Sequence, residues 1–302
     1  MEKKILIVGG TGFIGINLSK HCLKKKWYVT VLSRKKPKIK IKNIKYISAD
    51  ISKTEDLKKK IKFNYDYIIN LGGNINHSNH KQTYLTHFKG LKNLIGIAQN
   101  IGVKKFIQIG SSLEYEKKKP PHSENMVIKE KRLKSYYSKS KFQSTKFLFQ
   151  NQSKLKFNFI VLRLYQVYGP YQKFDRLIPF VIKSCLKNKK FPCSAGTQMR
   201  DFLHVNDVVR GIMLILKSKK AKREIINLGY GKPYKVIEII KAIRDIIKSG
   251  RLDIGKISIR KDESMISYPN IKKVYKLVGW KPKIRLLNGL KYTINHYKKV
   301  LK

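Results

Sequence analysis

A glycine-rich turn that follows a short apolar run is the feature that most constrains the fold of this chain. The run KILIV near the N-terminus is typical of a strand that is buried on both faces in a parallel sheet. The next residues read GGTGFIG, where Gly10, Gly12 and Gly15 match G-x-G-x-x-G, and Gly9, Gly12 and Gly15 match G-x-x-G-x-x-G. Either pattern alone is weak, so the residues that follow decide its meaning.

Those residues give the turn a specific context. FIGINLSKHCLKKK places Ile14, Leu18 and Cys22 at helical spacing, and WYVTVLSR then supplies a second apolar strand. In a strand, glycine turn, helix and strand of this kind, the N–H groups that open the helix point at the pyrophosphate of a dinucleotide. The sequence therefore predicts a dinucleotide-binding unit that begins at the first strand.

The predicted cofactor contacts lie mainly where the first four apolar runs end. Asp50, at the end of KYISAD, is expected to reach the adenine edge, and Gly72 and Gly73 would let the cofactor pass close to the end of DYIINLGG. The full set of predicted cofactor contacts is Gly9, Gly12, Phe13, Ile14, Gly15, Ser33, Arg34, Asp50, Ile51, Leu71, Gly72, Gly73, Tyr137 and Lys141.

The end of the second apolar run indicates which dinucleotide is bound. NAD sites of this kind usually place Asp or Glu there to bind the ribose hydroxyls, whereas the additional phosphate of NADP requires a basic residue. Here the run ends in Ser33, Arg34, Lys35 and Lys36, with no carboxylate. We therefore predict NADP, and NAD is the alternative, in which Arg34 is one more solvated cation.

Apolar runs continue to alternate with helical patterns along the first half of the chain. The further predicted strands are KYISAD, DYIINLGG, KKFIQIGSS and FNFIVLRLY, and the predicted helices cover residues 54–62, 81–101 and 136–152. Such alternation predicts an α/β fold with a Rossmann-like, doubly wound parallel sheet.

A large positive charge is the main feature of the composition. The chain has 302 residues, with 68 Lys and Arg against 18 Asp and Glu, and a formal net charge of +50. Binding to a polyanion is one interpretation, because lysines near phosphates release counterions. However, Lys is spread along the whole chain, whereas a nucleic-acid footprint is a clustered patch or stripe. We therefore do not expect specific nucleic-acid binding, although anionic substrates would be attracted.

The sequence predicts neither a membrane segment nor a metal site. No apolar run approaches the roughly 20 residues that a membrane-spanning helix needs, and the N-terminus lacks a secretory signal, so we expect a cytoplasmic protein. The three cysteines fit neither a disulfide framework nor a zinc spacing. His77, His80 and His87 have no Cys or carboxylate partner at zinc spacing.

A tyrosine and a lysine supply a candidate catalytic pair. In KSYYSKSKFQSTKFLF, Tyr137 and Lys141 are four residues apart and share one face of a helix. A nearby ammonium favours the phenolate, so Tyr137 could exchange a proton near neutral pH, while Lys141 would also hold the nicotinamide ribose. GSSLEYE follows the run KKFIQI, which places Ser111 and Ser112 at a strand end, where a hydroxyl can bond the reacting oxygen.

These motifs together resemble the extended short-chain dehydrogenase/reductase family, which comprises nucleotide-sugar epimerases, dehydratases and 4-ketoreductases. The segments that carry the resemblance occur in the family's order and cover nearly the whole chain: GGTGFIG, GSSLEY, YSKSK, RLYQVYGP, RDFLHVNDV, INLGYGKPY and GWKPKI. The resemblance implies a smaller C-terminal substrate-binding lobe. We place the dinucleotide-binding Rossmann domain at 1–169, with 200–229 returning to it, and the nucleotide-sugar-binding lobe at 170–199 and 230–302.

The resemblance implies a catalytic set of Ser111, Tyr137 and Lys141. Ser112 is the alternative for the serine, because the loop can be aligned with a shift of one residue. Dehydratases of the family carry an acidic pair directly after this serine or threonine, and here Ser112 and Leu113 occupy those places. Dehydration is therefore the least favoured of the three chemistries.

The resemblance also implies a nucleotide-diphosphate sugar as the ligand of the C-terminal lobe. Arg200 and Arg260 match positions at which family members hold the diphosphate, and the arginine fork suits phosphate oxygens. Gln166 and His87 each stand where the family usually carries Asn: Gln166 at a substrate-facing position, and His87 where the Asn helps the active-site lysine. A homodimer is the assembly for which we would test.

These features favour an NADP-dependent enzyme that reduces a nucleotide-linked 4-keto-6-deoxy sugar at C4. A nucleotide-sugar 4-epimerase, which takes a hydride and returns it and commonly keeps NAD, is the alternative enzyme. A non-catalytic dinucleotide- or RNA-binding protein on the same fold is an alternative of a different class, since fold does not fix function. The intact set of Ser111, Tyr137 and Lys141 argues against it.

Overall fold

The structure is a computed structural model, and its contacts divide the chain into two compact units. It describes residues 2–62, 64–73, 79–116, 118–259 and 264–301. The first unit comprises Met1–Glu116, Glu124–Leu164 and Ile212–Asn227, and the second comprises Lys117–Ser123, Tyr165–Gly211 and Leu228–Lys302. Each unit has its own core and is described by itself.

A seven-stranded sheet forms the centre of the first unit. Its strands are β1 (Lys4–Val8), β2 (Tyr28–Ser33), β3 (Ile44–Ser48), β4 (Tyr67–Asn70), β5 (Lys105–Ser111), β6 (Asn158–Leu164) and β10 (Glu224–Leu228). The spatial order is β10-β6-β5-β4-β1-β2-β3, and the pairs from β6 to β3 are all parallel. The chain builds outward from β1 in one direction and then from β4 in the other, so a topological switch point lies between β1 and β4.

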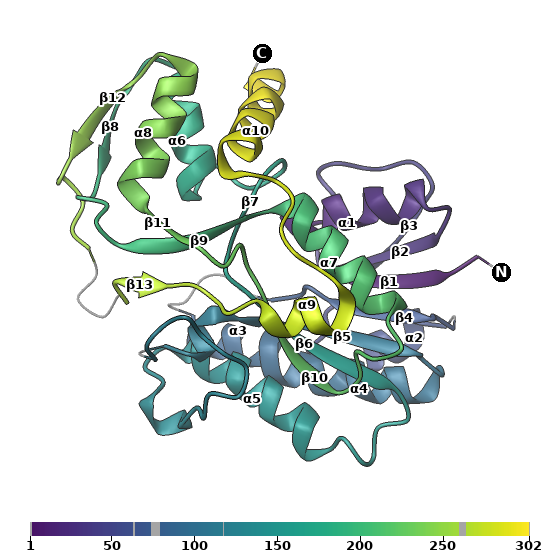
Figure 1. Ribbon diagram of the computed structural model, residues 1–302. Coiled ribbons are helices and arrows are strands. Elements are labelled where there is room, and N and C mark those ends of the chain that lie inside the picture. The colour runs from purple at the N-terminus through teal and green to yellow at the C-terminus, as the bar shows by residue number, and fades with distance from the viewer. Residues whose placement is uncertain (1, 63, 74–78, 117, 260–263, 302) are drawn as a thin grey trace. The chain divides into compact units, whose positions relative to one another are not determined.

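Helices cover both faces of this sheet (Figure 1). The helical elements between β1 and β6 are α1 (Phe13–Lys24), α2 (Thr54–Lys60), α3 (His80–Tyr84), the π-helical turn η1 (Leu85–Lys89), α4 (Gly90–Asn100), the 3-10 turns η2 (Ser112–Glu114) and η3 (Glu130–Arg132), and α5 (Tyr136–Gln150). One buried cluster joins these helices to the sheet. It contains Leu91 and Leu94 of α4, Leu148 of α5, and strand residues that point to the same face, such as Phe106 and Phe159. The other face receives α1, as Figure 1 shows.

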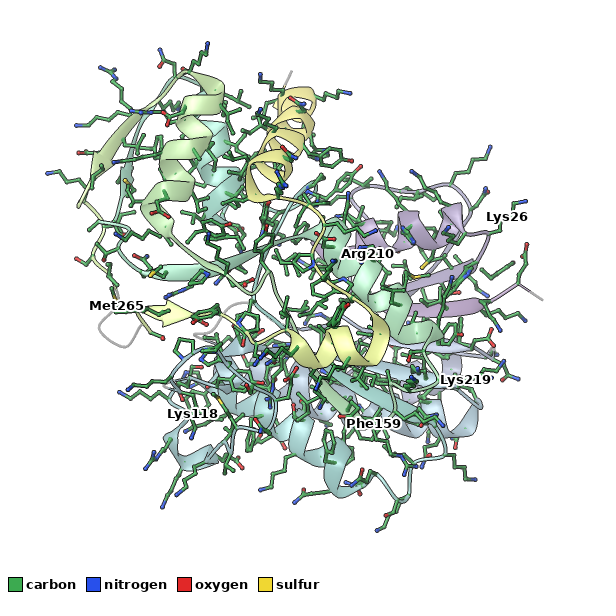
Figure 2. All side chains as sticks on the ribbon, viewed as in Figure 1. Lys26, Lys118, Phe159, Arg210, Lys219 and Met265 are labelled. Atoms are coloured by element: carbon green, nitrogen blue, oxygen red, sulfur yellow. The ribbon has the colours of Figure 1, made fainter. Side chains whose placement is uncertain are left out.

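The apolar runs thus form the strands that their composition predicts, and the predicted Rossmann-like α/β fold is confirmed. Figure 2 shows the side chain of Phe159 within the fold, where it is fully buried, whereas Lys26 and Lys219 extend into solvent. One helix differs from its prediction. The stretch predicted as a single helix over residues 81–101 is divided into α3, η1 and α4, and the π-helical turn contains His87.

The second unit contains small sheets and a layer of helices. Its elements are β7 (Gln166–Tyr168), α6 (Leu177–Leu186), β8 (Lys190–Cys193), β9 (Met199–His204), β11 (Pro233–Lys235), α8 (Val236–Ile247), β12 (Arg251–Ile254), β13 (Ile266–Ser267), α9 (Lys272–Val278) and α10 (Leu286–Leu301). β9 pairs with β7, β11 and β13, and β12 pairs with β8. Side chains from α6, α8 and α10 build the core, which includes Ile182, Ile240 and Ile294.

The division of the chain differs from the predicted domain boundaries at four places. Residues 117–123, 165–169, 200–211 and 228–229 belong to the second unit rather than the first. For 165–169 and 200–211 the reason is strand pairing: β7 and β9 are partners in one small sheet, so both stay with that sheet. The division then falls within α7 (Val205–Lys217), whose last residues return to the first unit.

Candidate active site

The glycine turn joins β1 to α1 with little space for side chains. Gly9 has a φ of +73°, and a Cβ there would lie 2.9 Å from the backbone nitrogen of Gly72. A Cβ on Gly15 would lie 2.4 Å from the Cα of Gly10. Close packing of this kind requires glycine at both positions.

The N-terminus of α1 fits an anionic group. Gly12 is the N-cap residue, and among the described residues no side chain caps this end and no acidic residue occupies its first turn. The backbone N–H groups of Phe13, Ile14 and Gly15 open the helix, where the helix dipole favours negative charge. The predicted pyrophosphate-binding residues therefore lie together in one uncapped helix start.

The end of β4 lies beside the glycine turn. Leu71 donates its N–H to the carbonyl of Val8, and the N–H of Gly72 bonds Oδ1 of Asn70 at 3.0 Å. A Cβ on Gly73 would lie 2.2 Å from Cε1 of His87, so the chain passes directly over that ring. The predicted residues of β1 and β4 are thus brought together at the switch point of the sheet.

The ends of β2 and β3 border a hollow of about 530 Å³ that Arg34, Ser48, Asp50 and Lys53 help to line. Arg34 is exposed, and the Ser33 hydroxyl donates to the carbonyl of Lys35 at 2.7 Å. The guanidinium is therefore available to an anionic ligand in solution.

Asp50 has a structural task beside this hollow. Its Oδ1 accepts both the N–H and the hydroxyl of Ser52, at 2.9 and 2.8 Å, which closes the turn after β3. The adjacent Ile51 is buried. The contact predicted between Asp50 and the adenine edge stays a prediction.

Ser111 is the last residue of β5 and the cap of η2. Its Oγ accepts the N–H of Leu113 at 3.2 Å, and its own N–H donates to Oε1 of Glu114 at 2.9 Å. The Ser111 hydroxyl also carries a proton, which it can donate to a ligand. Ser112 is half-buried and begins the 3-10 turn.

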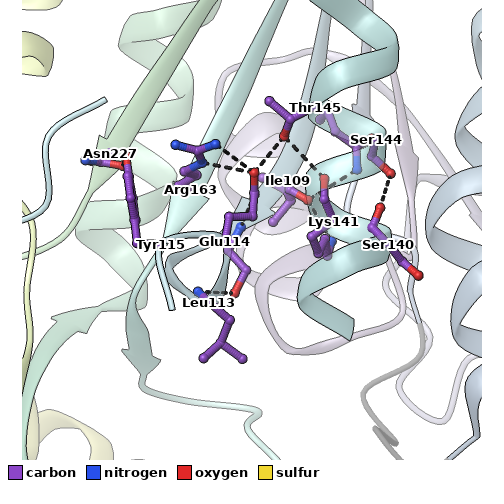
Figure 3. Close-up of polar contacts among 12 residues, drawn as sticks. Ile109, Leu113, Glu114, Tyr115, Ser140, Lys141, Ser144, Thr145, Arg163 and Asn227 are labelled. Carbon is purple, nitrogen blue, oxygen red and sulfur yellow. Dashed lines mark hydrogen bonds and ion pairs between the residues drawn. The ribbon is translucent and has the colours of Figure 1, made fainter. Parts of the chain in front are cut away.

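Tyr137 and Lys141 lie in the first turns of α5, which begins at a serine cap. Ser135 accepts the N–H of Ser138 at 3.0 Å. The Lys141 Nζ donates to the Ile109 carbonyl at 2.7 Å (Figure 3). The same atom lies 5.8 Å from the centre of the Tyr137 ring. Burial lowers the pKa of Lys141 to about 8, while the charge of Glu114 opposes that change. The predicted pair is therefore in contact, with its ammonium held inside the fold.

His87 also contacts the predicted catalytic tyrosine. Its ring is edge-on to that of Tyr137, with centroids 5.1 Å apart, and its carbonyl accepts the Ser144 hydroxyl at 2.8 Å. His80 instead stacks on Tyr136. His77 lies outside the described residues.

One buried ion pair of this region was not predicted from the sequence. Glu114 and Arg163 are buried, and Nη2 of Arg163 lies 2.9 Å from Oε2 of Glu114. The available signal was an arginine inside the apolar run FNFIVLRLY, since a charge in a buried strand requires a partner.

Two of the predicted substrate residues, Gln166 and Arg200, belong to the second unit, whereas Ser111 belongs to the first. Gln166 begins β7 and pairs with Phe202 of β9, two residues after Arg200. The Nη1 of Arg200 donates to the carbonyl of Met199 at 2.8 Å. Gln166 and Arg200 are therefore brought into one small sheet, whereas Arg260 lies outside the described residues.

Two further features concern the described part of the chain. None of its helices is long and apolar enough to cross a membrane. Within the same residues, no group of three or more His, Cys, Asp or Glu side chains could hold a metal ion.

Comparison with known proteins identifies the family. A UDP-glucuronate 4-epimerase from Thermodesulfobacterium geofontis (strain OPF15) is 30% identical over 213 residues, which cover 70% of this chain and 64% of that protein. CDP-abequose synthase from Salmonella muenchen is 33% identical over 135 residues, covering 44% of this chain and 46% of that protein. The crystal structure of a UDP-glucose 4-epimerase with UDP-glucose, from Thermotoga maritima, has a TM-score of 0.89 at 23% identity and covers 99% of this chain and 100% of that one.

A family profile gives the same assignment over most of the chain. The profile described as "NAD dependent epimerase/dehydratase family" matches residues 5–229, from β1 to the residue after β10. This chain belongs to the NAD-dependent epimerase/dehydratase family, the extended short-chain dehydrogenase/reductase group that its motifs resemble.

Proposed function

We propose that this protein is an NADP-dependent oxidoreductase that reduces the 4-keto group of a nucleotide-linked 4-keto-6-deoxy sugar. One observation carries the proposal: the contact of the Lys141 ammonium with the Tyr137 ring, 5.8 Å from Nζ to the ring centre. Ser111, at the end of β5, supplies a hydroxyl from the same strand that gives Lys141 its carbonyl partner, Ile109. A phenol, an ammonium and a hydroxyl are the groups that a carbonyl reduction needs.

Each of the three side chains has a distinct task in this reaction. Tyr137 gives its phenolic proton to the C4 oxygen, and the Lys141 ammonium stabilises the phenolate that remains. The Ser111 hydroxyl donates a hydrogen bond to the same oxygen, while its Oγ accepts the Leu113 N–H. NADPH, when bound, supplies the hydride that C4 receives. The carbonyl thus becomes an alcohol, and Tyr137 takes a new proton from water.

The groups that would hold the ligands follow from the same positions. The uncapped start of α1 would bind the cofactor pyrophosphate, and Arg34 would bind the additional phosphate of NADP. Gln166 and Arg200 would contact the sugar nucleotide in the second unit. Ser111 is assigned the catalytic role rather than Ser112 because it ends β5 and its hydroxyl is oriented by the backbone.

Two observations favour reduction over the other chemistries of the family. Arg34, exposed after β2, suits NADP, the cofactor that a reductase consumes. The positions of the dehydratase acidic pair hold Ser112 and Leu113, and the nearby Glu114 is buried in an ion pair. The partial likeness to a CDP-abequose synthase, named for a CDP-linked sugar, is consistent with this proposal. The likeness to a UDP-glucuronate 4-epimerase makes 4-epimerisation the second candidate.

The test is to follow NADPH oxidation by absorbance with a panel of nucleotide-linked 4-keto-6-deoxy sugars. We expect turnover that falls by about 10²- to 10⁴-fold in Tyr137→Phe, with cofactor affinity nearly unchanged. Tyr136→Phe is the matched control, because Tyr136 is the neighbouring, exposed tyrosine of the same helix and should keep wild-type turnover.

Two outcomes would contradict the proposal in different ways. If Tyr137→Phe matches the wild type within a factor of two, Tyr137 is not the proton donor. If the wild type interconverts two nucleotide sugars with no net loss of NADPH, the enzyme is a 4-epimerase. The cytoplasmic location and the homodimer stay predictions.

A further inference from the structure

One buried carboxylate in the first unit bonds three different elements. Oε1 of Glu114 accepts the N–H of Ser111 at 2.9 Å, and Oε2 accepts the hydroxyl of Thr145 at 2.8 Å. The Nε and Nη2 atoms of Arg163 also donate to Oε2, at 3.0 and 2.9 Å. Figure 3 shows Glu114 between Arg163 of β6 and Thr145 of α5. The end of β5, the middle of α5 and the end of β6 therefore meet at this one side chain.

The partners of Glu114 are themselves fixed. The guanidinium carbon of Arg163 lies 4.6 Å from the centre of the Tyr115 ring, and the Tyr115 hydroxyl donates to Asn227 at 2.8 Å. Glu114 and Arg163 are only 0% and 1% exposed. Charge-assisted bonds inside a fold are short and directional, so each partner holds Glu114 in a single geometry.

The contact with Thr145 leads to the predicted catalytic turn. Thr145 lies one helical turn after Lys141, and its hydroxyl also approaches the Lys141 carbonyl at 3.3 Å. Glu114 thus joins the serine at one end of the site to the helix that carries Lys141 and Tyr137.

Stability alone does not account for this pair. Replacing a buried ion pair by apolar residues of similar volume is often neutral or stabilising, whereas breaking one partner away is costly. What apolar residues could not replace is the bond from Oε1 to the Ser111 N–H and the bond from Oε2 to Thr145.

We propose that Glu114 is a positioning residue. It holds Ser111 in a fixed position relative to the turn of α5 that carries Tyr137 and Lys141. This inference rests on the proposed function, and it assigns the task to a residue that itself does not touch the reacting atoms. The expected effect is large because an error of about 1 Å in the position of a reacting group can reduce the rate by 10²-fold.

The decisive variant is Thr145→Val, which is close in shape to threonine and leaves the Glu114–Arg163 pair intact. We expect kcat to fall by about tenfold with little change in KM, and Thr145→Ser to restore it, since the hydroxyl returns. Thr293→Val is the matched control: Thr293 is also buried and helical, and its hydroxyl donates to the Gly289 carbonyl at 2.7 Å in the second unit. Thermal unfolding of all three variants is measured alongside.

A second readout does not depend on turnover. The double variant Glu114→Gln with Arg163→Met removes both buried charges, so that neither is left unpaired. Within the described residues, the titratable groups that then contact Lys141 or its partner ring include Tyr137 on α5 and, beyond it, His87 on η1. Glu114 raises the pKa of Lys141, which burial lowers to about 8. We expect the double variant to lower that pKa further, measured by NMR of the lysine Cε resonance that Lys141→Met removes.

The two readouts separate this inference from the proposed function. The inference is overturned if Thr145→Val keeps kcat within twofold of the wild type while Tyr137→Phe is inactive, or if Thr145→Ser fails to restore kcat. If no sugar is turned over by the wild type, the proposed function fails. The NMR titration then tests the role of Glu114 without an activity assay. An unchanged Lys141 pKa in the double variant then overturns the inference, and a lowered one supports it.

Discussion

Replacement of Lys141 by methionine tests the electrostatic part of the reaction most directly. The Lys141 side chain is buried, and its Nζ lies 5.8 Å from the centre of the Tyr137 ring. Methionine keeps an unbranched side chain of similar length, which suits the buried position, and removes only the charge and the bond to the Ile109 carbonyl. The variant should therefore fold, and its thermal midpoint shows whether it does.

The magnitude follows from the distance between Nζ and the centre of the Tyr137 ring, taken as the position of the phenolate charge. With an effective dielectric constant of about 20, two unit charges 5.8 Å apart attract by about 3 kcal/mol, or about 100-fold in rate. Lys141→Met should lose this factor in kcat, since the phenolate that follows proton transfer is no longer stabilised. Lys139→Met, on the same helix with Nζ 5.6 Å from the Tyr136 ring, should keep kcat.

The pH profile supplies the second half of the assay. Burial lowers the pKa of Lys141 from 10.5 to about 8, so the ammonium is lost as the pH rises through 8. Wild-type kcat should therefore decline above pH 8, and this decline should be absent from Lys141→Met. The reasoning is refuted if the wild type keeps constant kcat from pH 7 to pH 10, or if Lys141→Met turns over within twofold of the wild type.

Three further substitutions test the cofactor and substrate sites. Arg34→Ala should weaken NADP by about tenfold or more and leave NAD unchanged, because a charge-assisted bond is lost, with the exposed Lys36→Ala as control in a binding titration. Equal loss of both cofactors would contradict this. Arg200→Ala should raise the KM for the sugar nucleotide without weakening NADP; a matching loss of cofactor affinity would place it elsewhere. Gly15→Ala should abolish cofactor binding and lower the thermal midpoint, because its Cβ would lie 2.4 Å from the preceding turn, whereas Gly96→Ala meets nothing within 4 Å and should stabilise α4. Gly15→Ala with wild-type affinity would refute the packing argument.

Much of the first unit follows from local sequence patterns. KILIV, YVTVLS and KFIQIGS are rich in Ile, Leu, Val, Tyr or Phe, so they form the buried strands β1, β2 and β5. The π-helical turn at 85–89 has no such signal, because one extra residue per turn barely disturbs the apolar spacing of a long helix. The division within α7 was equally hidden, since the pairing of β7 with β9 is a contact between distant segments.

The candidate site shows the same contrast between local and distant contacts. Tyr137 and Lys141 could be paired from the sequence because four residues on a helix bring two side chains together. Glu114 and Arg163 are 49 positions apart, and only the register of β5 with β6 places Ser111 opposite Leu164, next to that arginine. A charged residue within an apolar strand indicates that an oppositely charged partner exists. Which residue is that partner depends on the register of the sheet.

The scarcity of acidic residues gives the buried carboxylates a further significance. Against 68 basic residues the chain has 18 acidic ones, yet Glu114, Asp201 and Asp207 are all buried. Asp201 accepts the N–H groups of residues 230–231, and Asp207 accepts those of residues 283–284. Each of these bonds pairs a backbone N–H with a charged acceptor, and a bond of this kind contributes about 1.5–3 kcal/mol. The excess charge therefore belongs to the solvated surface, where it attracts anions without selecting them. Selection of a nucleotide sugar would then depend on the few groups whose positions the buried carboxylates fix.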